Sequence, residues 1–145
     1  MRLNMDCVRD ILLCVEENTD LRQYCRFLDL HYTRTATYVW DKPDEPENYQ
    51  KALLEKYPND VLAYHVRYCI DCDLIVECEG SNVYCTFISD LTPAGHEFIA
   101  NMRNDTFYNK VKGIGSELGL NSLNDLLQIA AGCASAMIKN HFNLP

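Results

Sequence analysis

Hydrophobic residues recur every three or four positions in six separate stretches of the chain, and this spacing is typical of amphipathic helices. The helices that it predicts span about residues 5–17, 47–57, 60–72, 93–103, 107–118 and 123–140. Polar residues that favour helix starts precede three of them, namely Asn4, Asn59 or Asp60, and Ser122. Gly119 stands where the fifth of these helices should end.

Two shorter stretches, residues 74–78 and 83–88, have the composition of β-strands, and the turn residues Gly80-Ser81-Asn82 lie between them. They predict a hairpin that follows directly on the helix over about 60–72. Residues 21–40 are rich in aromatic residues and predict one or two more short strands.

The order helix, irregular segment, two helices, hairpin and three helices is the outline of a winged helix-turn-helix domain. We therefore expect a mainly α (α+β) fold, a winged helix-turn-helix-like domain with a two-stranded wing and a C-terminal helical arm. Residues 1–104 would form the winged-helix-like domain, and residues 105–145 the arm packed on it, in a single compact unit. Residues 60–72 would be the recognition-type helix and Gly80-Ser81-Asn82 the tip of the wing.

Six short phrases along the chain add to this interpretation. They are Met5-Asp6-Cys7-Val8-Arg9-Asp10-Ile11-Leu12-Leu13, Tyr64-His65-Val66, Leu74-Ile75, Asp90-Leu91-Thr92-Pro93-Ala94-Gly95-His96-Glu97-Phe98, Asn101-Met102-Arg103-Asn104-Asp105 and Lys110-Val111-Lys112. In this order they resemble the family known as domain of unknown function 2513, over nearly the whole chain except the variable segment at about 19–58. The resemblance implies a small winged-helix-like protein, often carried by phages and other mobile elements, with no assigned chemistry. Members have glycine before the Leu-Ile pair, where this chain has Asp73, a residue that tolerates positive φ better than most.

Charge narrows the range of functions. The chain has 145 residues, with 13 Lys and Arg against 21 Asp and Glu, a net charge of −8. This excess of acidic residues argues against electrostatic binding to nucleic-acid phosphates or to an anionic membrane. No apolar run approaches the roughly 18 residues of a membrane-spanning helix, and Asp6 interrupts a signal-peptide pattern, so we expect a cytoplasmic protein. Its eight cysteines should then stay reduced, as small buried residues.

DNA binding is the activity that a winged helix suggests first, but few residues suit it. The candidates are Asn59, Tyr64, Arg67 and Tyr68 on the recognition-type helix, with Ser81 and Asn82 at the wing tip. Residues 61–100 hold one Lys or Arg, Arg67, against six acids, so few phosphate contacts are available. A DNA-binding transcriptional regulator acting as a dimer is therefore the alternative hypothesis.

The same acidity suits a basic protein partner, and one acidic, aromatic segment is the first candidate for a binding surface. Its residues are Trp40, Asp41, Asp44, Glu45 and Glu47. Aromatic side chains anchor interfaces, while complementary charge governs partner choice. In the phage setting that the resemblance implies, the partner would be a host nucleic-acid or defence enzyme, and the acidic surface would imitate a phosphate backbone. The competing interpretation is a solvated acidic loop, as charge runs usually are.

Chemistry at the cysteines is a weaker hypothesis. Cys69, Cys72, Cys78 and Cys85 give the spacing C-x2-C-x5-C-x6-C, which would suit four zinc thiolates. Two of them fall on a predicted helix and two on the hairpin, where they would equally line the core. No local signature surrounds a Cys–His pair, and no glycine-rich phosphate loop follows a strand. We expect no metal, no cofactor, no catalytic residue and no enzymatic activity.

The last predicted helix carries small residues on several faces, at 130–136. Small side chains let helices approach closely, either within one chain or across a symmetric dimer. The sequence thus indicates a non-enzymatic interaction module for a protein partner, away from the membrane. Homodimerisation through the C-terminal helix is a further hypothesis.

Overall fold

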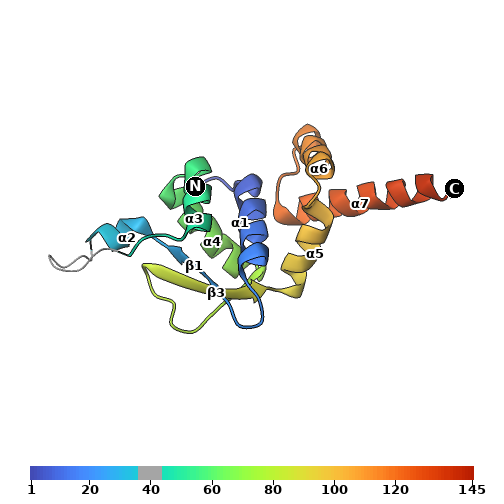
Figure 1. Ribbon diagram of the computed structural model, residues 1–145. Coiled ribbons are helices and arrows are strands. Elements are labelled where there is room, and N and C mark those ends of the chain that lie inside the picture. Colours follow the sequence, from blue (N-terminus) through green and yellow to red (C-terminus); the bar gives the residue numbers. More distant parts are fainter. Residues whose placement is uncertain (36–43) are drawn as a thin grey trace. The chain divides into compact units, whose positions relative to one another are not determined.

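The computed structural model describes residues 1–35 and 44–145, and the chain divides into two compact units, Met1–His96 and Glu97–Pro145. In the described residues the fold is mainly helical with one small antiparallel sheet, as the sequence predicts (Figure 1). The boundary expected between residues 104 and 105 falls within the second of these units.

The first unit combines helices with a three-stranded sheet. Its elements are α1 (Met5–Asn18), β1 (Cys25–Leu28), α2 (Leu30–Thr35), α3 (Asn48–Lys56), α4 (Asn59–Asp71), β2 (Ile75–Glu77) and β3 (Cys85–Leu91). The strands lie in the order β1-β3-β2 and pair antiparallel. The expected two-stranded wing is therefore wrong, because β1, a strand of the aromatic stretch, joins the predicted hairpin on its β3 side. Helix α1 contacts α3, α4 and β3, which places the core of this unit around it.

The start of α1 is capped as predicted and is tied to α4. The side chain of Asn4 accepts a hydrogen bond from the Cys7 N–H at 3.2 Å. The Asn4 backbone N–H donates to Nε2 of His65 at 2.8 Å, and Nδ1 of His65 lies 2.7 Å from the Val61 carbonyl oxygen. The buried imidazole therefore accepts at Nε2 and carries its proton on Nδ1, and it joins the two helices.

The segment after α1 holds one strand and one helix in its described part, not two strands. β1 is the strand expected in the aromatic stretch, but Leu30–Thr35 forms the helix α2. Asp29 lies where the chain changes from strand to helix. Its backbone N–H still donates across to the Tyr84 carbonyl, while its side chain accepts from the His31 N–H, as a helix cap does.

Both ends of α4 are unusual. The predicted cap at Asn59 or Asp60 is wrong, because Pro58 holds the N-cap position and the Asn59 side chain instead accepts from the Leu30 N–H. Beyond the other end, Asp73 has φ of 56°, the left-handed conformation that glycine normally supplies.

Helix α5 (Pro93–Met102) begins in the first unit, where its first turn is fixed against the turn that precedes β2. Thr92 Oγ1 accepts from the Gly95 N–H at 3.0 Å and donates to the Asp73 carbonyl at 2.5 Å. Gly95 packs so closely on the Leu74 carbonyl that any β-carbon at this position would clash with it. Glycine is therefore required at position 95 by close approach.

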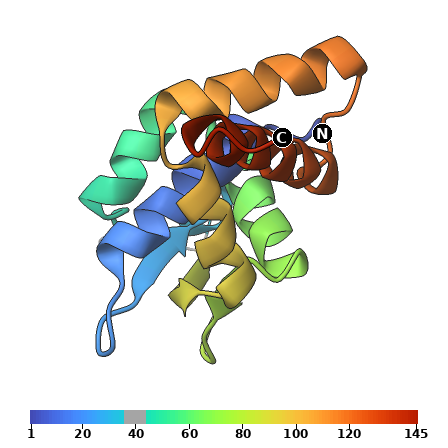
Figure 2. The ribbon, with the colours of Figure 1, turned by 90° about the vertical axis from the view of Figure 1, so that its right-hand side faces the viewer.

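The second unit consists of the rest of α5 and two longer helices, α6 (Asp105–Leu118) and α7 (Leu123–His141). Helices α6 and α7 pack on each other (Figure 2). Asn104 caps α6, and Ser122 caps α7 as predicted, each by accepting a backbone N–H three residues on. Gly119, with φ of 69°, ends α6 as the sequence predicts.

None of the eight cysteines forms a disulfide, and five are buried: Cys7, Cys14, Cys25, Cys69 and Cys85. Burial raises the pKa of Cys7, Cys14 and Cys25 to about 12. At neutral pH these thiols are therefore protonated and act as small hydrophobic side chains, as the sequence suggested.

Candidate functional site

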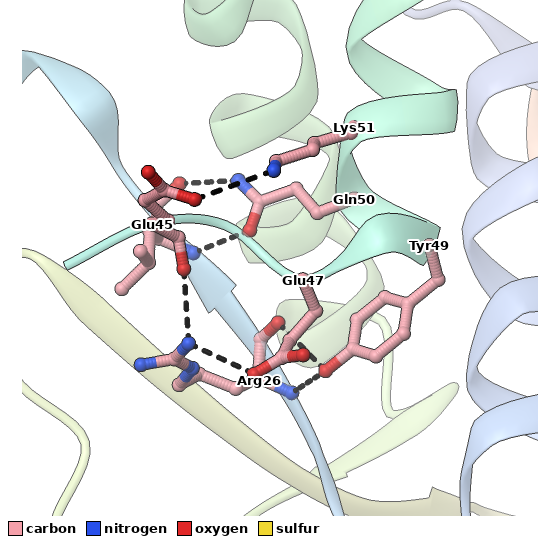
Figure 3. A network of polar contacts seen from close by, with 7 residues as sticks. Arg26, Glu45, Glu47, Tyr49, Gln50 and Lys51 are labelled. Atoms are coloured by element: carbon pink, nitrogen blue, oxygen red, sulfur yellow. Dashed lines mark hydrogen bonds and ion pairs between the residues drawn. The ribbon is translucent and has the colours of Figure 1, made fainter.

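The outer edge of β1 is covered by side chains of α3 (Figure 3). The Tyr49 hydroxyl accepts from the Arg26 N–H at 2.7 Å and donates to the Arg26 carbonyl at 3.1 Å. Gln50 pairs with Leu28 in the same manner, with Oε1 accepting at 2.9 Å and Nε2 donating at 2.7 Å. The backbone groups of β1 that do not pair with β3 are thus satisfied, and this edge is closed to strands of other chains.

The end of the acidic segment is held beside this edge by ion pairs. Arg26 Nη2 lies 3.0 Å from Glu47 Oε1, and it also donates to the Glu45 carbonyl at 3.0 Å. Lys51 Nζ lies 3.5 Å from Glu45 Oε2. The side chains of Glu45 and Glu47 nevertheless remain 82% and 51% exposed, so both are accessible to a partner as well.

A pocket of about 350 Å³ opens between β1, α2, α4 and the hairpin loop. Phe27, Tyr32, Tyr64 and Val83 are among the residues that line it, and we call it the aromatic pocket. Tyr32 and Tyr64 are each 43% exposed and Val83 is 70% exposed, whereas Phe27 is buried. The aromatic pocket therefore reaches the core and has hydrophobic side chains accessible at its rim, which is typical of binding sites.

Two charged side chains of opposite sign also line the aromatic pocket, Asp29 and Arg67. Arg67 Nη1 lies 3.4 Å from Glu77 Oε2 on β2, and Asp29 accepts from the Asn59 side-chain amide at 2.9 Å. The surrounding unit is strongly acidic: residues 1–96 contain nine Lys and Arg against seventeen Asp and Glu. Residues 97–145 contain four of each, so the net charge of −8 belongs to the first unit.

The structure brings three of the six candidate DNA contacts to the aromatic pocket, namely Tyr64, Arg67 and Asn82. The other three, Asn59, Tyr68 and Ser81, do not line it. Tyr68 is half-buried on α4, and the Asn59 side chain is bonded to α2 and Asp29 as described above. Helix α4 and the loop between β2 and β3 therefore do meet, but around a pocket.

The two candidate DNA contacts in the loop between β2 and β3 use their polar groups to build that loop. Ser81 Oγ donates to the Cys78 carbonyl at 3.0 Å and accepts from the Phe87 N–H at 3.0 Å. Asn82 Oδ1 accepts from the Cys85 N–H at 2.9 Å. These side chains hold the loop between β2 and β3 and have less capacity left for a ligand.

Of the residues proposed for partner binding, Trp40 and Asp41 lie outside the described residues, whereas Asp44 is exposed. The small residues at 130–136 lie on α7, and Ala130 is the one among them that is buried. No helix in the described part of the chain is long and apolar enough to cross a membrane.

The four cysteines considered as zinc ligands differ in their surroundings. Cys69 and Cys85 are buried, and Cys72 and Cys78 are half-buried. Among residues 1–35 and 44–145, no three His, Cys, Asp or Glu side chains are grouped so that they could hold a metal ion. The structure does not bring these four thiols together as a metal centre.

Three contributors to the site were missed in the sequence. Gln50 is a polar residue on the inner face of the predicted helix over 47–57, three positions before the buried Leu53, and this position was the signal for its role. Phe27 and Val83 were assigned to strands with no indication that they line one pocket with α4.

Together these features define a small, mainly helical protein with a three-stranded antiparallel sheet and an aromatic pocket in its acidic unit. Residues 2–121 match the family described as hypothetical protein (DUF2513), and the chain belongs to this family. The family resemblance read from the sequence is thereby confirmed. All of α7 lies beyond the matched residues. No curated protein and no solved structure matches the chain.

Proposed function

We propose that this protein is a non-enzymatic interaction module in which the aromatic pocket receives an apolar or aromatic side chain of a basic partner protein. One observation carries the proposal: Tyr32, Tyr64 and Val83 are exposed around a hollow that reaches the core. Tyrosines on the rim of a pocket are frequent anchors of protein interfaces. Hydrophobic side chains gathered at a concave site distinguish it from singly exposed ones, which need no explanation.

The charge of the first unit supports a basic partner. All of the net charge of −8 lies on residues 1–96, and a field of this sign raises the rate of encounter with a cationic surface. The exposed carboxylates of Asp44, Glu45 and Glu47 add to this field. We keep the acidic segment at 41–47 as the second contact surface in the proposal.

The proposal includes a winged-helix fold for residues 1–96. In its support, a helix and a strand precede α3, α4 and the hairpin, and β1 pairs with β3 in the sheet order β1-β3-β2. A fold of this class does not by itself imply DNA binding, because function depends on the side chains at the site. The proposal also includes a phage or mobile-element protein that acts in the cytoplasm on a host nucleic-acid or defence enzyme.

DNA binding by a dimer is the competing function, and the site does not favour it. Arg67 is the one Lys or Arg among the six candidate contacts, and it is paired with Glu77. Ser81 and Asn82 use their polar groups in the wing loop. A site that makes few phosphate contacts lacks most of the counterion release that drives DNA binding.

The test is selection of a random linear peptide library on the folded protein, followed by affinity measurement on the enriched peptides. We expect peptides that combine an aromatic or aliphatic anchor with Lys or Arg. Tyr64→Ala should weaken their binding by at least about tenfold, because it removes an anchor at the pocket rim. Tyr24→Ala is the matched control, since Tyr24 is an exposed tyrosine of the same unit, 57% exposed, and does not line the pocket.

Two results would overturn the proposal. The first is the absence of enriched peptides, or enriched peptides that bind the Tyr64→Ala variant as tightly as the unmodified protein. The second is binding of a mixed-sequence DNA duplex with a Kd of about 10⁻⁴–10⁻⁶ M that weakens steeply with salt, which would favour the DNA-binding function instead.

A further inference from the structure

The carboxylate of Asp29 lies in the wall of the aromatic pocket, at the point where β1 ends and α2 begins. Its Oδ1 atom accepts two hydrogen bonds, one from the His31 N–H at 3.1 Å and one from the side-chain amide of Asn59 at 2.9 Å. Its Oδ2 atom accepts none from the residues that the structure describes. Because these residues hold no buried side-chain oxygen without a partner, Oδ2 is in contact with solvent.

The charge of this carboxylate is not balanced by a cation of the protein. In the described part of the chain Asp29 takes part in no ion pair. The amide that bonds it is neutral and also donates to a second carboxylate, since Asn59 Nδ2 lies 3.3 Å from Asp60 Oδ1. Two carboxylates that share one neutral donor leave an excess of negative charge beside the pocket, which a cation would stabilise.

The α4 side of the aromatic pocket has the opposite character. Tyr64 and Arg67 stand three positions apart on α4 and both line the pocket, and Arg67 is the one Lys or Arg among the described lining residues. Its guanidinium is paired with Glu77, which does not line the pocket. The positive charge on this side is therefore compensated from outside, whereas the negative charge of Asp29 is not.

The walls of the pocket define the ligand that fits them. Phe27 is buried at the pocket, and the rim residues Tyr64 and Val83 keep apolar surface exposed, so the interior suits an apolar group. A cation attached beside that group would find its partner at Asp29, because Arg67 repels it from the α4 side. The ligand is thus a pair of neighbouring groups, one apolar and one cationic.

We propose that Asp29 selects a Lys or Arg side chain at a fixed position beside the apolar side chain that enters the aromatic pocket. The cation donates a charge-assisted hydrogen bond to Oδ2. This proposal rests on the function proposed for the pocket and adds the residue that determines its specificity. The net charge of the first unit attracts cations at any position and is screened beyond about 8 Å at physiological ionic strength, whereas Asp29 acts at one position.

Asp29→Asn tests the proposal on the protein side, with the peptides that the random library yields on the unmodified protein as probes. Asparagine has the same shape and keeps one oxygen for the two donors that Oδ1 accepts, so the change removes the charge and the Oδ2 acceptor. We expect the Kd of these peptides to rise about tenfold at physiological ionic strength. Asp20→Asn is the matched control, because Asp20 also accepts two hydrogen bonds, at 2.7 and 2.8 Å, and does not line the pocket.

Replacement of the cation tests the proposal on the peptide side. Each enriched peptide is synthesised with its Arg replaced by citrulline or its Lys by norleucine, which keep the side-chain length without the charge. We expect this replacement to weaken binding about tenfold to the unmodified protein and to Asp20→Asn, and by less than about twofold to Asp29→Asn. The enriched peptides should also carry the cation at one constant spacing from the apolar anchor.

The outcomes separate this proposal from the function on which it rests. A neutral replacement that weakens binding to Asp29→Asn as strongly as to the unmodified protein would overturn the role of Asp29. So would cations at no constant spacing from the anchor, a result that needs no variant and does not depend on the folding of Asp29→Asn. In both cases weaker binding to Tyr64→Ala would still support the aromatic pocket as the binding site. Absence of enriched peptides would overturn the proposed function and this proposal together.

Discussion

The side chain of Gln50 replaces a neighbouring strand at the edge of the sheet, and its replacement by leucine measures what this contact is worth. Gln50 is 1% exposed, and its amide forms both hydrogen bonds to Leu28, at 2.9 and 2.7 Å. Leucine has a similar size but no polar atom. In Gln50→Leu the N–H and the carbonyl of Leu28 therefore stay buried beneath α3 without a partner.

The expected cost follows from these two groups. Each buried backbone group left without a hydrogen bond costs about 1–3 kcal/mol, which gives about 2–6 kcal/mol for the pair. Better burial of the leucine side chain offsets about 1–2 kcal/mol of this. We therefore expect the free energy of unfolding to fall by about 3 kcal/mol, a large part of the roughly 5–15 kcal/mol that a domain has.

Urea denaturation followed by circular dichroism measures this difference, and hydrogen exchange at the Leu28 amide locates it. Gln128→Leu is the matched control, because Gln128 is exposed on α7, and it should change stability by no more than about 0.5 kcal/mol. Gln50→Glu adds a check of the donor. Its carboxylate would face the Leu28 carbonyl at neutral pH, and burial would raise the pKa of this carboxyl above its ordinary value. Part of the lost stability should therefore return as the pH falls toward about 4, the pKa of the carboxyl in the unfolded chain.

Two outcomes would refute this reasoning about Gln50. One is a Gln50→Leu variant as stable as the Gln128→Leu variant, with an unchanged rate of exchange at the Leu28 amide. The other is a Gln50→Glu variant whose stability, relative to the unmodified protein, does not improve as the pH falls. Either result would mean that water or a shifted backbone satisfies the edge of β1 without the glutamine.

His65→Phe should lower the free energy of unfolding by about 1–3 kcal/mol in urea titration, because it leaves the half-buried Asn4 N–H without its acceptor; an unchanged midpoint would contradict this. Gly119→Ala should cost about 1 kcal/mol because φ is 69°, whereas Gly113→Ala, on an open face of α6, should stabilise by up to about 1 kcal/mol. Thermal melting temperatures that shift in the same direction would contradict this pair. The free energy of unfolding should fall as the pH rises above about 9, by up to about 1.4 kcal/mol per pH unit for each buried thiol, because these thiols ionise at about pH 9 once unfolded. The thiols concerned are those of Cys7, Cys14 and Cys25, whose pKa values in the folded protein are about 12. A free energy of unfolding that stays constant between about pH 9 and 11 would contradict this prediction.

The longer helices could be predicted because their signals are local. The 3.6-residue period fixes their positions, and single residues fix their ends, such as Asn4 before α1, Ser122 before α7 and Gly119 after α6. Each of these residues acts on backbone groups within a few positions of itself. The turn at Asp73 was equally local, since a left-handed φ depends on the residue that adopts it.

The elements that were missed depend on distant parts of the chain. The register of β1 pairs Cys25 with Ile88, and no short-range pattern announces a partner so far along the sequence. α2 has six residues, too few to establish a helical period, and its start depends on Asp29. The aromatic pocket was missed for the same reason, because β1, α2, α4 and the loop before β3 each contribute a wall.

The candidate DNA contacts were chosen by residue type, and the structure explains why type alone does not select function here. Serine and asparagine suit phosphate and base contacts, but they equally suit tight turns, where their side chains bond to nearby backbone groups. The Ser81 side chain makes two such bonds. The side-chain oxygen of Asn82 accepts from the backbone N–H groups of Tyr84 and Cys85.

Hydrogen-bonding capacity that the fold has not already used is therefore a better guide to binding than residue identity. The polar side chains of Ser81 and Asn82 are committed to the structure of the loop between β2 and β3. The exposed rings of Tyr32 and Tyr64, in contrast, keep apolar surface in water beside a pocket. Transfer of apolar surface from water to a partner is favourable. A polar group gains little from the same transfer, because it exchanges hydrogen bonds with water for hydrogen bonds with the partner. The side chains that look least like nucleic-acid ligands in this unit are for that reason the ones on which its binding function should depend.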